Sequence, residues 1–217
     1  MSAGTFVTID RTFRDKDEVV VVLPQEVKAT LWPLDGIVIE RGPLVYSLKI
    51  EEEWQSVEQA AEVAEAVIGI YDLNKKYPGL LARNAYPKSP WNYALEIDPE
   101  SVAKNVQVSE AEWQDEHPFS GAAPPILLRV PARRVIGWQL EEMKELVQQG
   151  DWDHPQAMHT RRGQFALTPQ LPSASGPPVK LGEATEMVTL VPYGCARLRL
   201  TIFPQARKLA SLNQQKA

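Results

Sequence analysis

Alternation of apolar and polar side chains is clearest in residues 44–50. Gly42 supplies backbone freedom and Pro43 has no N–H to donate, so strand pairing can begin only after them. One face of the following strand carries Leu44, Tyr46, Leu48 and Ile50, and the other carries Val45, Ser47 and Lys49. The first face is too apolar to be left in water, so the pattern predicts a core strand.

The N-terminal part of the chain has the pattern of a β-hairpin. Residues 5–13 alternate, a polar turn follows at residues 14–17, and residues 18–23 form an apolar run closed by Pro24. The consecutive valines from Val19 to Val22 predict a strand that is covered on both faces. Further strands are predicted at residues 26–32, 36–41, 91–97, 102–108, 126–130, 133–138, 186–191 and 195–203, with Pro131 separating two of them.

Two segments have helical rather than strand-like periodicity. In residues 54–68 apolar side chains recur at three- or four-residue intervals among glutamates, which predicts an amphipathic helical insertion at about residues 54–69. Residues 139–149 predict a second, short helix that Gly150 ends. Residues 71–90 and 109–125 are expected to be irregular, the loosest loop is expected at about residues 151–178, and residues 205–217 read as a polar tail.

These elements together predict an all-β fold, an antiparallel β-sandwich with one or two short helical insertions. A chain of 217 residues can bury one large core or two small ones, and sandwiches often reach this size undivided. We therefore expect one β-sandwich domain over residues 1–204, followed by the tail.

Charge and composition exclude several classes of protein. The net charge of −5 and the absence of a Lys/Arg cluster argue against a nucleic-acid partner. The longest apolar runs are far too short to span a bilayer, and the N-terminus lacks the regions of a signal peptide. The single cysteine, Cys195, precludes an internal disulfide. We expect a soluble, cytoplasmic chain with no membrane partner.

No cofactor or metal motif is evident. There is no phosphate-binding glycine loop, Rossmann fingerprint or nucleophile elbow. The spacing of His154 and His159, interrupted by Pro155, fits no helical metal motif, so we expect this segment to be a solvated loop. Cys195 is expected to be a buried structural thiol, because free cysteines are most often buried.

Carboxylates and aromatic rings are the remaining candidates for chemistry. A glycosidase needs two carboxylates about 5–9.5 Å apart, and the acidic residues in or beside predicted strands are Glu40, Glu96, Asp98, Glu183 and Glu186. Glu40 is the catalytic candidate, with a structural ion pair to Arg41 or to a cross-strand arginine as the simpler explanation. Rings can stack on the apolar faces of sugars, and the candidates for carbohydrate contact are Trp91, Tyr93, Trp113 and Trp152. Trp91 and Tyr93 share a strand face, which forms a stacking platform if it is the outer face and core if it is the inner one; core is favoured.

Four motifs in order carry a family resemblance that covers nearly the whole chain. Residues 4–24, 40–48, 91–95 and 190–204 resemble the C-terminal part of the beta-L-arabinofuranosidase-type glycoside hydrolases, glycoside hydrolase family 127 and relatives. The resemblance implies a β-sandwich and an association with carbohydrate enzymes. In that family the catalytic residues and a zinc-bound cysteine nucleophile lie in an N-terminal helical barrel that has no counterpart in this sequence, so the resemblance implies no active site, metal or cofactor here.

The resemblance leads to three hypotheses about function. The first is an accessory sandwich with a structural or weak sugar-binding role. The second is a free-standing glycosidase with a carboxylate pair, acting on a β-linked arabinose- or galactose-type sugar (beta-galactosidase-like), and the third is a purely structural fragment. Because the family's strands before Gly4 and its barrel are missing from this sequence, an open sheet edge and an apolar patch are expected. Self-association, or docking onto a separately encoded catalytic barrel, is therefore predicted.

Overall fold

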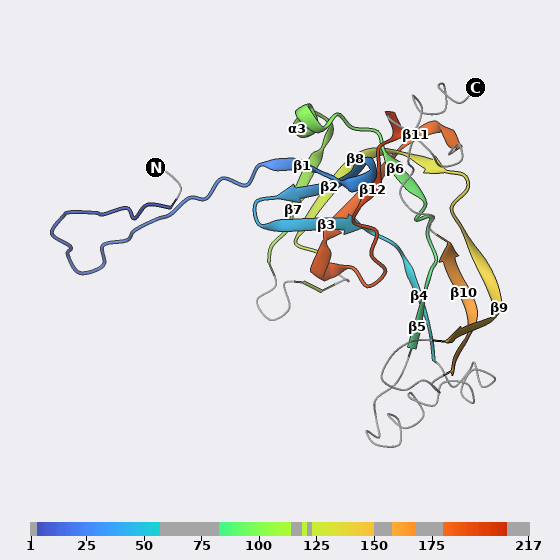
Figure 1. Cartoon of the computed structure of the whole chain (residues 1–217). Helices are drawn as coiled ribbons and strands as arrows, with labels where there is room; N and C mark the ends of the chain where they lie inside the picture. Colours follow the sequence, from blue (N-terminus) through green and yellow to red (C-terminus); the bar gives the residue numbers. More distant parts are fainter. Residues whose placement is uncertain are drawn as a thin grey trace, which may run out of the picture.

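The computed structural model describes residues 4–56, 83–113, 119–120, 123–149, 158–167 and 180–207. The predicted all-β class is confirmed, because antiparallel strands dominate and the helical segments are short insertions (Figure 1). No helix in these ranges is long and apolar enough to cross a membrane.

One sheet of eight strands forms the body of the molecule. Its hydrogen-bonded path runs β1-β2-β3-β11-β8-β6, while β12 pairs with β2 and β7 pairs with β8. The bounds are β1 Val27–Trp32, β2 Gly36–Arg41, β3 Leu44–Leu48, β6 Tyr93–Leu95, β7 Gln107–Glu110, β8 Ile126–Val135, β11 Leu181–Pro192 and β12 Phe203–Pro204. Short 3-10 turns interrupt it at η1 (Pro33–Asp35), η3 (Pro99–Ser101) and η4 (Tyr193–Cys195), and one helical turn, α3 (Val102–Asn105), follows η3.

The sheet curls until β12 closes it, joining β2 near one end to β6 at the other. Phe203 and Pro204 of β12 pair with the start of β2, and the next residue, Gln205, bridges to Leu95 of β6. Strands β2, β3, β11, β8 and β6 thus enclose a common interior, and the two layers of the predicted sandwich are halves of one curled sheet. The interior is apolar, with Ile37, Ile39, Tyr46, Leu48, Leu95, Leu128, Val130, Leu190 and Phe203 all at most 2% exposed.

Strand β3, which the alternation in residues 44–50 predicted, lies at the centre of this core. Tyr46 and Leu48 of β3 are buried as predicted, and Ser47 on the opposite face is also fully buried. Its hydroxyl bonds to that of Thr201, so the polar group is not left unpaired. Gly42, at the β2–β3 turn, has a φ of 55°, a conformation that glycine adopts without strain.

Strand β8 runs straight through Pro131, where two separate strands were predicted. The reason lies in its neighbours on one side. There β7 pairs with residues 126–129 and β6 with residues 132–134, so Pro131 falls at the junction between the two strands. Its carbonyl accepts the Glu96 N–H at 2.8 Å, and its missing N–H costs no bond to a strand.

Two predicted helices are contradicted wherever the structure describes them. Residues 139–149 form β9 (Gln139–Gln149), which pairs with β10 (Met158–Leu167) in a two-stranded ribbon. Strand β10 occupies the middle of the predicted loose loop at 151–178, whose residues 151–157 and 168–178 lie outside the described ranges. Residues 54–56 of the predicted insertion at 54–69 belong to β4 (Glu52–Ser56), paired with β5 (Arg83–Pro87) in the expected loop at 71–90. Residues 57–69 lie outside the described ranges.

Two smaller predictions also need correction. The expected strand at 102–108 is the helical turn α3 followed by β7, because Asp98 caps η3 by accepting the Glu100 N–H at 3.1 Å. The expected strand at 195–203 is irregular except for its last residue in β12, since η4 turns the chain at Cys195. Residues 208–217 of the expected tail lie outside the described ranges.

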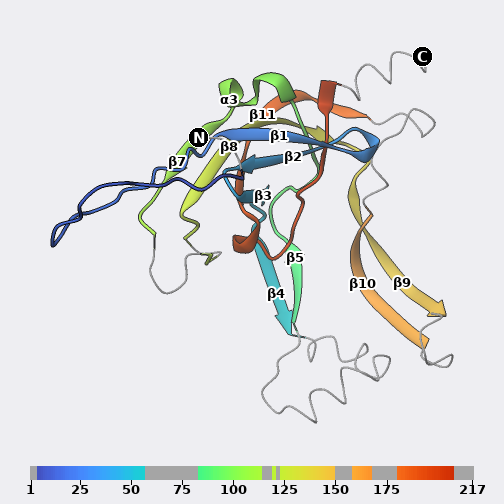
Figure 2. The ribbon, with the colours of Figure 1, turned by 60° about the vertical axis from the view of Figure 1, so that its left-hand side comes forward.

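The predicted N-terminal hairpin does not pair with the sheet. Residues 5–26 contain no strand, and the segment runs away from the body before β1 begins (Figures 1 and 2). The valines expected to be covered on both faces are instead 54–81% exposed. A strand needs a hydrogen-bonded neighbour, and no described strand of this chain lies beside them.

Candidate functional site

A hollow of about 330 Å³ opens where the β4–β5 ribbon leaves the sheet. Its walls come from the β3–β4 connection, the end of β11 and the segment after η4, and its lining residues are Lys49, Ile50, Glu51, Glu52, Trp54, Val191, Cys195, Ala196 and Arg197. Register explains why these segments meet, because Leu48 and Ser47 of β3 pair with Leu190 and Val191 of β11. The hollow therefore follows from the sheet topology.

Glu52 joins the parts of this site. One carboxylate oxygen accepts the backbone N–H groups of Arg197 and Leu198, both at 3.1 Å. The other oxygen accepts the indole N–H of Trp54 at 3.0 Å. The carboxylate thus holds the post-η4 segment against the ribbon and fixes the orientation of the indole. Trp54 itself remains 46% exposed.

The rim around the indole is polar and carries both signs of charge. Lys49 and Arg197 supply cations, and Glu51 supplies a second carboxylate. The backbone of Glu51 is held from the β5 side, because its N–H donates to the Ser89 hydroxyl at 2.8 Å and its carbonyl accepts the Lys88 N–H at 2.7 Å.

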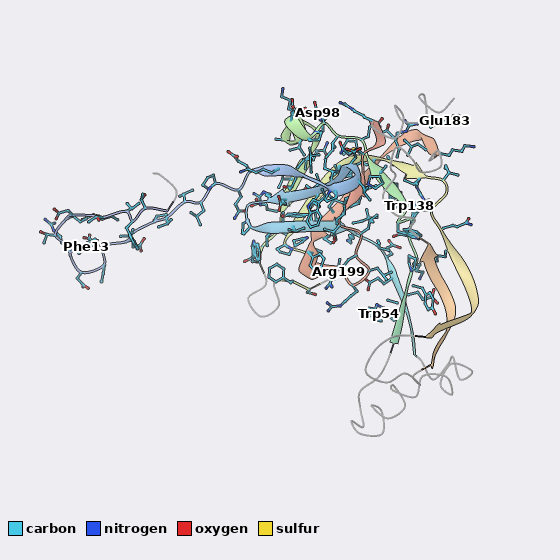
Figure 3. All side chains as sticks on the ribbon, in the orientation of Figure 1. Phe13, Trp54, Asp98, Trp138, Glu183 and Arg199 are labelled. Carbon is cyan, nitrogen blue, oxygen red and sulfur yellow. The ribbon has the colours of Figure 1, made fainter. Side chains whose placement is uncertain are left out.

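Arg199 lies close to this site in the sequence and in space. Its guanidinium stacks over the Tyr193 ring at 4.3 Å, and its Nε donates to the Ala196 carbonyl at 2.9 Å. Figure 3 shows Arg199 on the same side of the body as Trp54. The segment that closes the hollow is thereby stiffened by its own side chains.

The floor of the hollow is apolar. Val191, Cys195 and Ala196 form a small buried cluster, against which Leu127 packs. Cys195 is 5% exposed, in agreement with its predicted burial. Burial raises the pKa of its thiol, and the nearby Arg197 charge only partly opposes this. The group is thus a neutral thiol at neutral pH and is not activated as a nucleophile.

The catalytic candidate Glu40 lies elsewhere. It is in β2 and is not among the lining residues of the hollow. Its carboxylate accepts a hydrogen bond from the Thr30 hydroxyl of β1, instead of the expected ion pair with an arginine. Its neighbour Arg41 is paired with Glu110 of β7 and also donates to the Gln25 side chain at 2.9 Å.

The four candidates for carbohydrate contact are not brought together. Tyr93 is 5% exposed and belongs to the core. Trp91 is half-buried and stacks on Trp138, with ring centroids 6.3 Å apart and planes 17° from parallel. Trp113 is 45% exposed and meets Phe119 edge-on at 6.2 Å. Trp152 lies outside the described ranges.

Glu186 belongs to a polar cluster that fastens three strands. The Tyr93 hydroxyl donates to one of its oxygens at 2.8 Å, and Arg134 Nε donates to the other at 3.0 Å. Arg134 also lies 4.7 Å from the centroid of the Tyr93 ring and donates to the Asn92 side chain at 3.3 Å. The Tyr93 hydrogen bond, with help from Arg134, lowers the pKa of Glu186. Burial, with the Glu186 contact, raises the pKa of Tyr93 to about 12.

The remaining acidic candidates are also placed away from the hollow. Glu96 accepts the Thr185 hydroxyl, and Asp98 caps η3. Figure 3 shows Asp98 and Glu183 at the opposite end of the body from Trp54. The lowered pKa of Glu186 argues against a role as general acid, and its two hydrogen bonds link β6, β8 and β11.

Metal ligation has no support in the described ranges, where no group of three or more His, Cys, Asp or Glu side chains could hold an ion. His117 and His154 lie outside those ranges, and His159 is in β10.

Trp54 is a candidate site residue that the sequence pattern did not indicate. Its periodicity with the residues that follow suggested a helix, so its position at the mouth of a hollow was not expected. The one available signal is its position directly after three glutamates, at residues 51–53.

Comparisons of this chain with protein-family models, with curated proteins and with solved structures found no match.

Proposed function

We propose that this chain is a carbohydrate-binding accessory domain, and that its sugar site is the hollow beside Trp54. The observation that carries the proposal is a half-exposed indole, fixed by Glu52, at the mouth of a hollow whose rim carries carboxylates and cations. A role in carbohydrate metabolism also agrees with the resemblance of the chain to the C-terminal sandwich of beta-L-arabinofuranosidase-type enzymes.

The chemistry of the site suits a sugar. The C–H face of a sugar ring stacks on an indole, while its hydroxyl groups donate to carboxylates and accept from ammonium or guanidinium groups. Lys49, Glu51 and Arg197 provide both kinds of partner around Trp54. The volume is at the small end of the usual ~300–1,000 Å³ of ligand sites, which favours one terminal sugar unit over a long chain.

The family resemblance narrows the ligand to β-linked arabinose- or galactose-type sugars. It also suggests the biological context, in which the domain acts beside a catalytic helical barrel. We expect weak binding, with a Kd on the order of 1 mM, because a small and open hollow buries little of its ligand.

The alternative of a free-standing glycosidase rests on Glu51 and Glu52, which line the same hollow. Two features make binding the better proposal. Neighbouring side chains on extended backbone point to opposite sides, so these carboxylates do not face one another across a substrate. Glu52 moreover accepts three N–H groups, which favours its charged form over that of a general acid.

A tryptophan fluorescence titration tests the proposal. L-Arabinose, D-galactose and their methyl β-glycosides are titrated into the wild type, Trp54→Phe and Trp113→Phe. Trp113 is a matched control, because its exposure of 45% equals that of Trp54 to within a percentage point and it lies outside the hollow. A saturable change is expected in the wild type and in Trp113→Phe, and none in Trp54→Phe.

Two results would contradict this proposal. If none of these sugars changes the fluorescence of the wild type, the purely structural role is favoured. If the purified chain hydrolyses aryl β-glycosides and both Glu51→Gln and Glu52→Gln abolish the activity, the glycosidase alternative is favoured.

A further inference from the structure

Residues 5–24 form an apolar N-terminal arm that belongs neither to the core nor to the lining of the hollow. It contains no strand and extends away from the body before β1 (Figures 1 and 2). Nine large apolar side chains on it are 51–102% exposed: Phe6, Val7, Ile9, Phe13, Val19, Val20, Val21, Val22 and Leu23. Exposed apolar surface on this scale is typical of an interaction site.

The turn of the arm is already formed. Asp17 accepts the Arg14 N–H at 2.8 Å and the Arg11 guanidinium at 2.9 Å, and its own N–H donates to the Arg14 carbonyl at 3.1 Å. Lys16 takes the positive φ, 64°, that such a turn requires. The Arg11 guanidinium also lies 5.4 Å from the centroid of the Phe13 ring. The arm thus has the shape of a hairpin whose limbs are rich in β-branched residues and form no strand.

A second exposed apolar group lies at the far end of β1. Leu31 and Trp32, on opposite faces of the end of β1, and Leu34 in η1 are 59%, 48% and 49% exposed, and we call this group the β1 patch. The arm joins β1 at Val27, whereas the patch begins at its last residues. The arm points away from the body in both ribbon views, so it does not cover the patch of its own chain. A second copy in antiparallel orientation would place the root of its arm beside this patch.

We propose that two copies of this chain exchange their arms across a two-fold axis, with residues 19–23 of each arm packing on the β1 patch of the other copy. A run of valines is stable when both of its faces are buried. In the exchanged dimer, one face packs on the β1 patch of the partner and the other face packs on the arm of the partner. The same operation covers both arms and both patches.

Area and charge both favour a second copy as the occupant. The nine side chains expose roughly 500–1,000 Å² per copy, comparable with the ~800 Å² per partner of a standard interface. The charges of the arm are nearly balanced, with Arg11, Arg14 and Lys16 against Asp10, Asp15, Asp17 and Glu18. Two arms can therefore approach one another without like-charge repulsion.

Sedimentation of the full chain tests the exchange. The wild type is expected to sediment with the mass of two chains, and Val20→Asp/Val22→Asp with the mass of one. These valines are 78% and 81% exposed and make no core contact, so the variant should keep the far-UV spectrum of the wild type. Val108→Asp is the control: Val108, on β7, is 41% exposed and belongs neither to the arm nor to the β1 patch, so this variant should remain a dimer.

Cross-linking distinguishes arm exchange from any other dimer. Val22→Cys and Leu34→Cys are prepared separately, mixed and oxidised, and a covalent pair containing one of each is expected. The buried Cys195 stays unreactive. A monomeric wild type, a dimer that survives the Val20→Asp/Val22→Asp change, or oxidation that gives no covalent pair of one Val22→Cys chain with one Leu34→Cys chain would overturn the proposal. A monomer that associates through its arm with a separate catalytic barrel would overturn it as well.

Discussion

Replacing Glu52 is the most informative single perturbation of the hollow, because one carboxylate holds three N–H donors from two parts of the chain. Glu52→Ala removes the bonds from Arg197 and Leu198 at 3.1 Å and from the Trp54 indole at 3.0 Å. Glu52→Gln keeps one acceptor oxygen, but its amide group then points two N–H donors at one of the former donor sites. At least one contact is lost in either orientation of the amide.

The expected destabilisation follows from the exposure of these groups. A hydrogen bond contributes about 0.5–1.5 kcal/mol net, and more to a charged acceptor. The Arg197 N–H and the indole lie near solvent and water can replace the lost partner, so the low end of that range applies to them. The sum for Glu52→Ala is about 2 kcal/mol, and that for Glu52→Gln is about 1 kcal/mol. At about 2–4 °C per kcal/mol for a chain of this size, Tm should fall by ~4–8 °C and ~2–4 °C respectively.

Thermal unfolding followed by far-UV circular dichroism measures the Tm of each variant and tests whether Glu52→Ala loses more than Glu52→Gln. Glu51→Gln serves as the control, because Glu51 lines the same hollow without receiving these three N–H groups. Its Tm should stay within about 1 °C of the wild type. The tryptophan emission of Glu52→Gln should also change, because its indole is no longer anchored. If the Tm of Glu52→Ala equals that of the wild type, the carboxylate does not hold the site together. The proposal that Glu52 fixes the Trp54 indole in place for a ligand would then be refuted.

Further predictions concern the core, the polar cluster and the thiol. Phe203→Ala, which empties a fully buried site where the sheet closes, should cost about 3–5 kcal/mol in urea unfolding, and a loss below about 1 kcal/mol would mean that β12 does not close the sheet there. The folded-state pKa of Glu186 is lowered, so its stabilisation is present above the ordinary value of 4.5 and is lost as pH falls through the folded pKa. Glu186→Gln should weaken this acid dependence of the urea midpoint, and an unchanged dependence would contradict the role of the Tyr93 and Arg134 contacts. The pKa of Tyr93 is raised to about 12, so stability should fall as pH rises from about 10 to 12, and the last phenolate to appear by absorbance should be absent from Tyr93→Phe. Cys195 should react with thiol reagents only after unfolding, and rapid modification at neutral pH would refute its burial.

The sequence predicted those parts of the fold that depend on turn residues and on the alternation of neighbouring side chains. The turn at Gly42 and Pro43 and the alternation after it specify β3, and the structure has both. The helix predicted at residues 139–149 was wrong: Leu140, Met143, Leu146 and Val147 have the spacing of a helix, yet these residues pair with β10, which begins at Met158. Strand pairing overrides helix propensity, and the periodicity of one segment does not show whether a partner strand follows it.

The hollow could not be predicted for the same reason. Its walls come from residues 49–52, 54, 191 and 195–197, which the register between β3 and β11 brings together. Trp54 was placed on a helix face, so its ring was not considered as a ligand platform. The aromatic candidates that the pattern did suggest were chosen from sequence context alone, and Tyr93 proved to be part of the core.

The N-terminal arm shows the opposite case. Its alternation and its valine run are strong strand signals, and they predicted a covered hairpin. The structure provides the turn but no neighbouring strand within the described ranges. The residues that were wrongly predicted to pair within the chain are thus the basis of the proposed arm exchange.

A sugar titration followed by ¹H–¹⁵N correlation spectra tests the central claim most directly. The indole N–H signals of the six tryptophans are separate reporters within one sample, and the signal missing from Trp54→Phe identifies the one at the hollow. Our account predicts that a β-linked arabinose or galactose glycoside shifts the Trp54 indole signal saturably and leaves that of Trp113 in place. An unmoved Trp54 signal, or equal movement of all the indole signals, would contradict it.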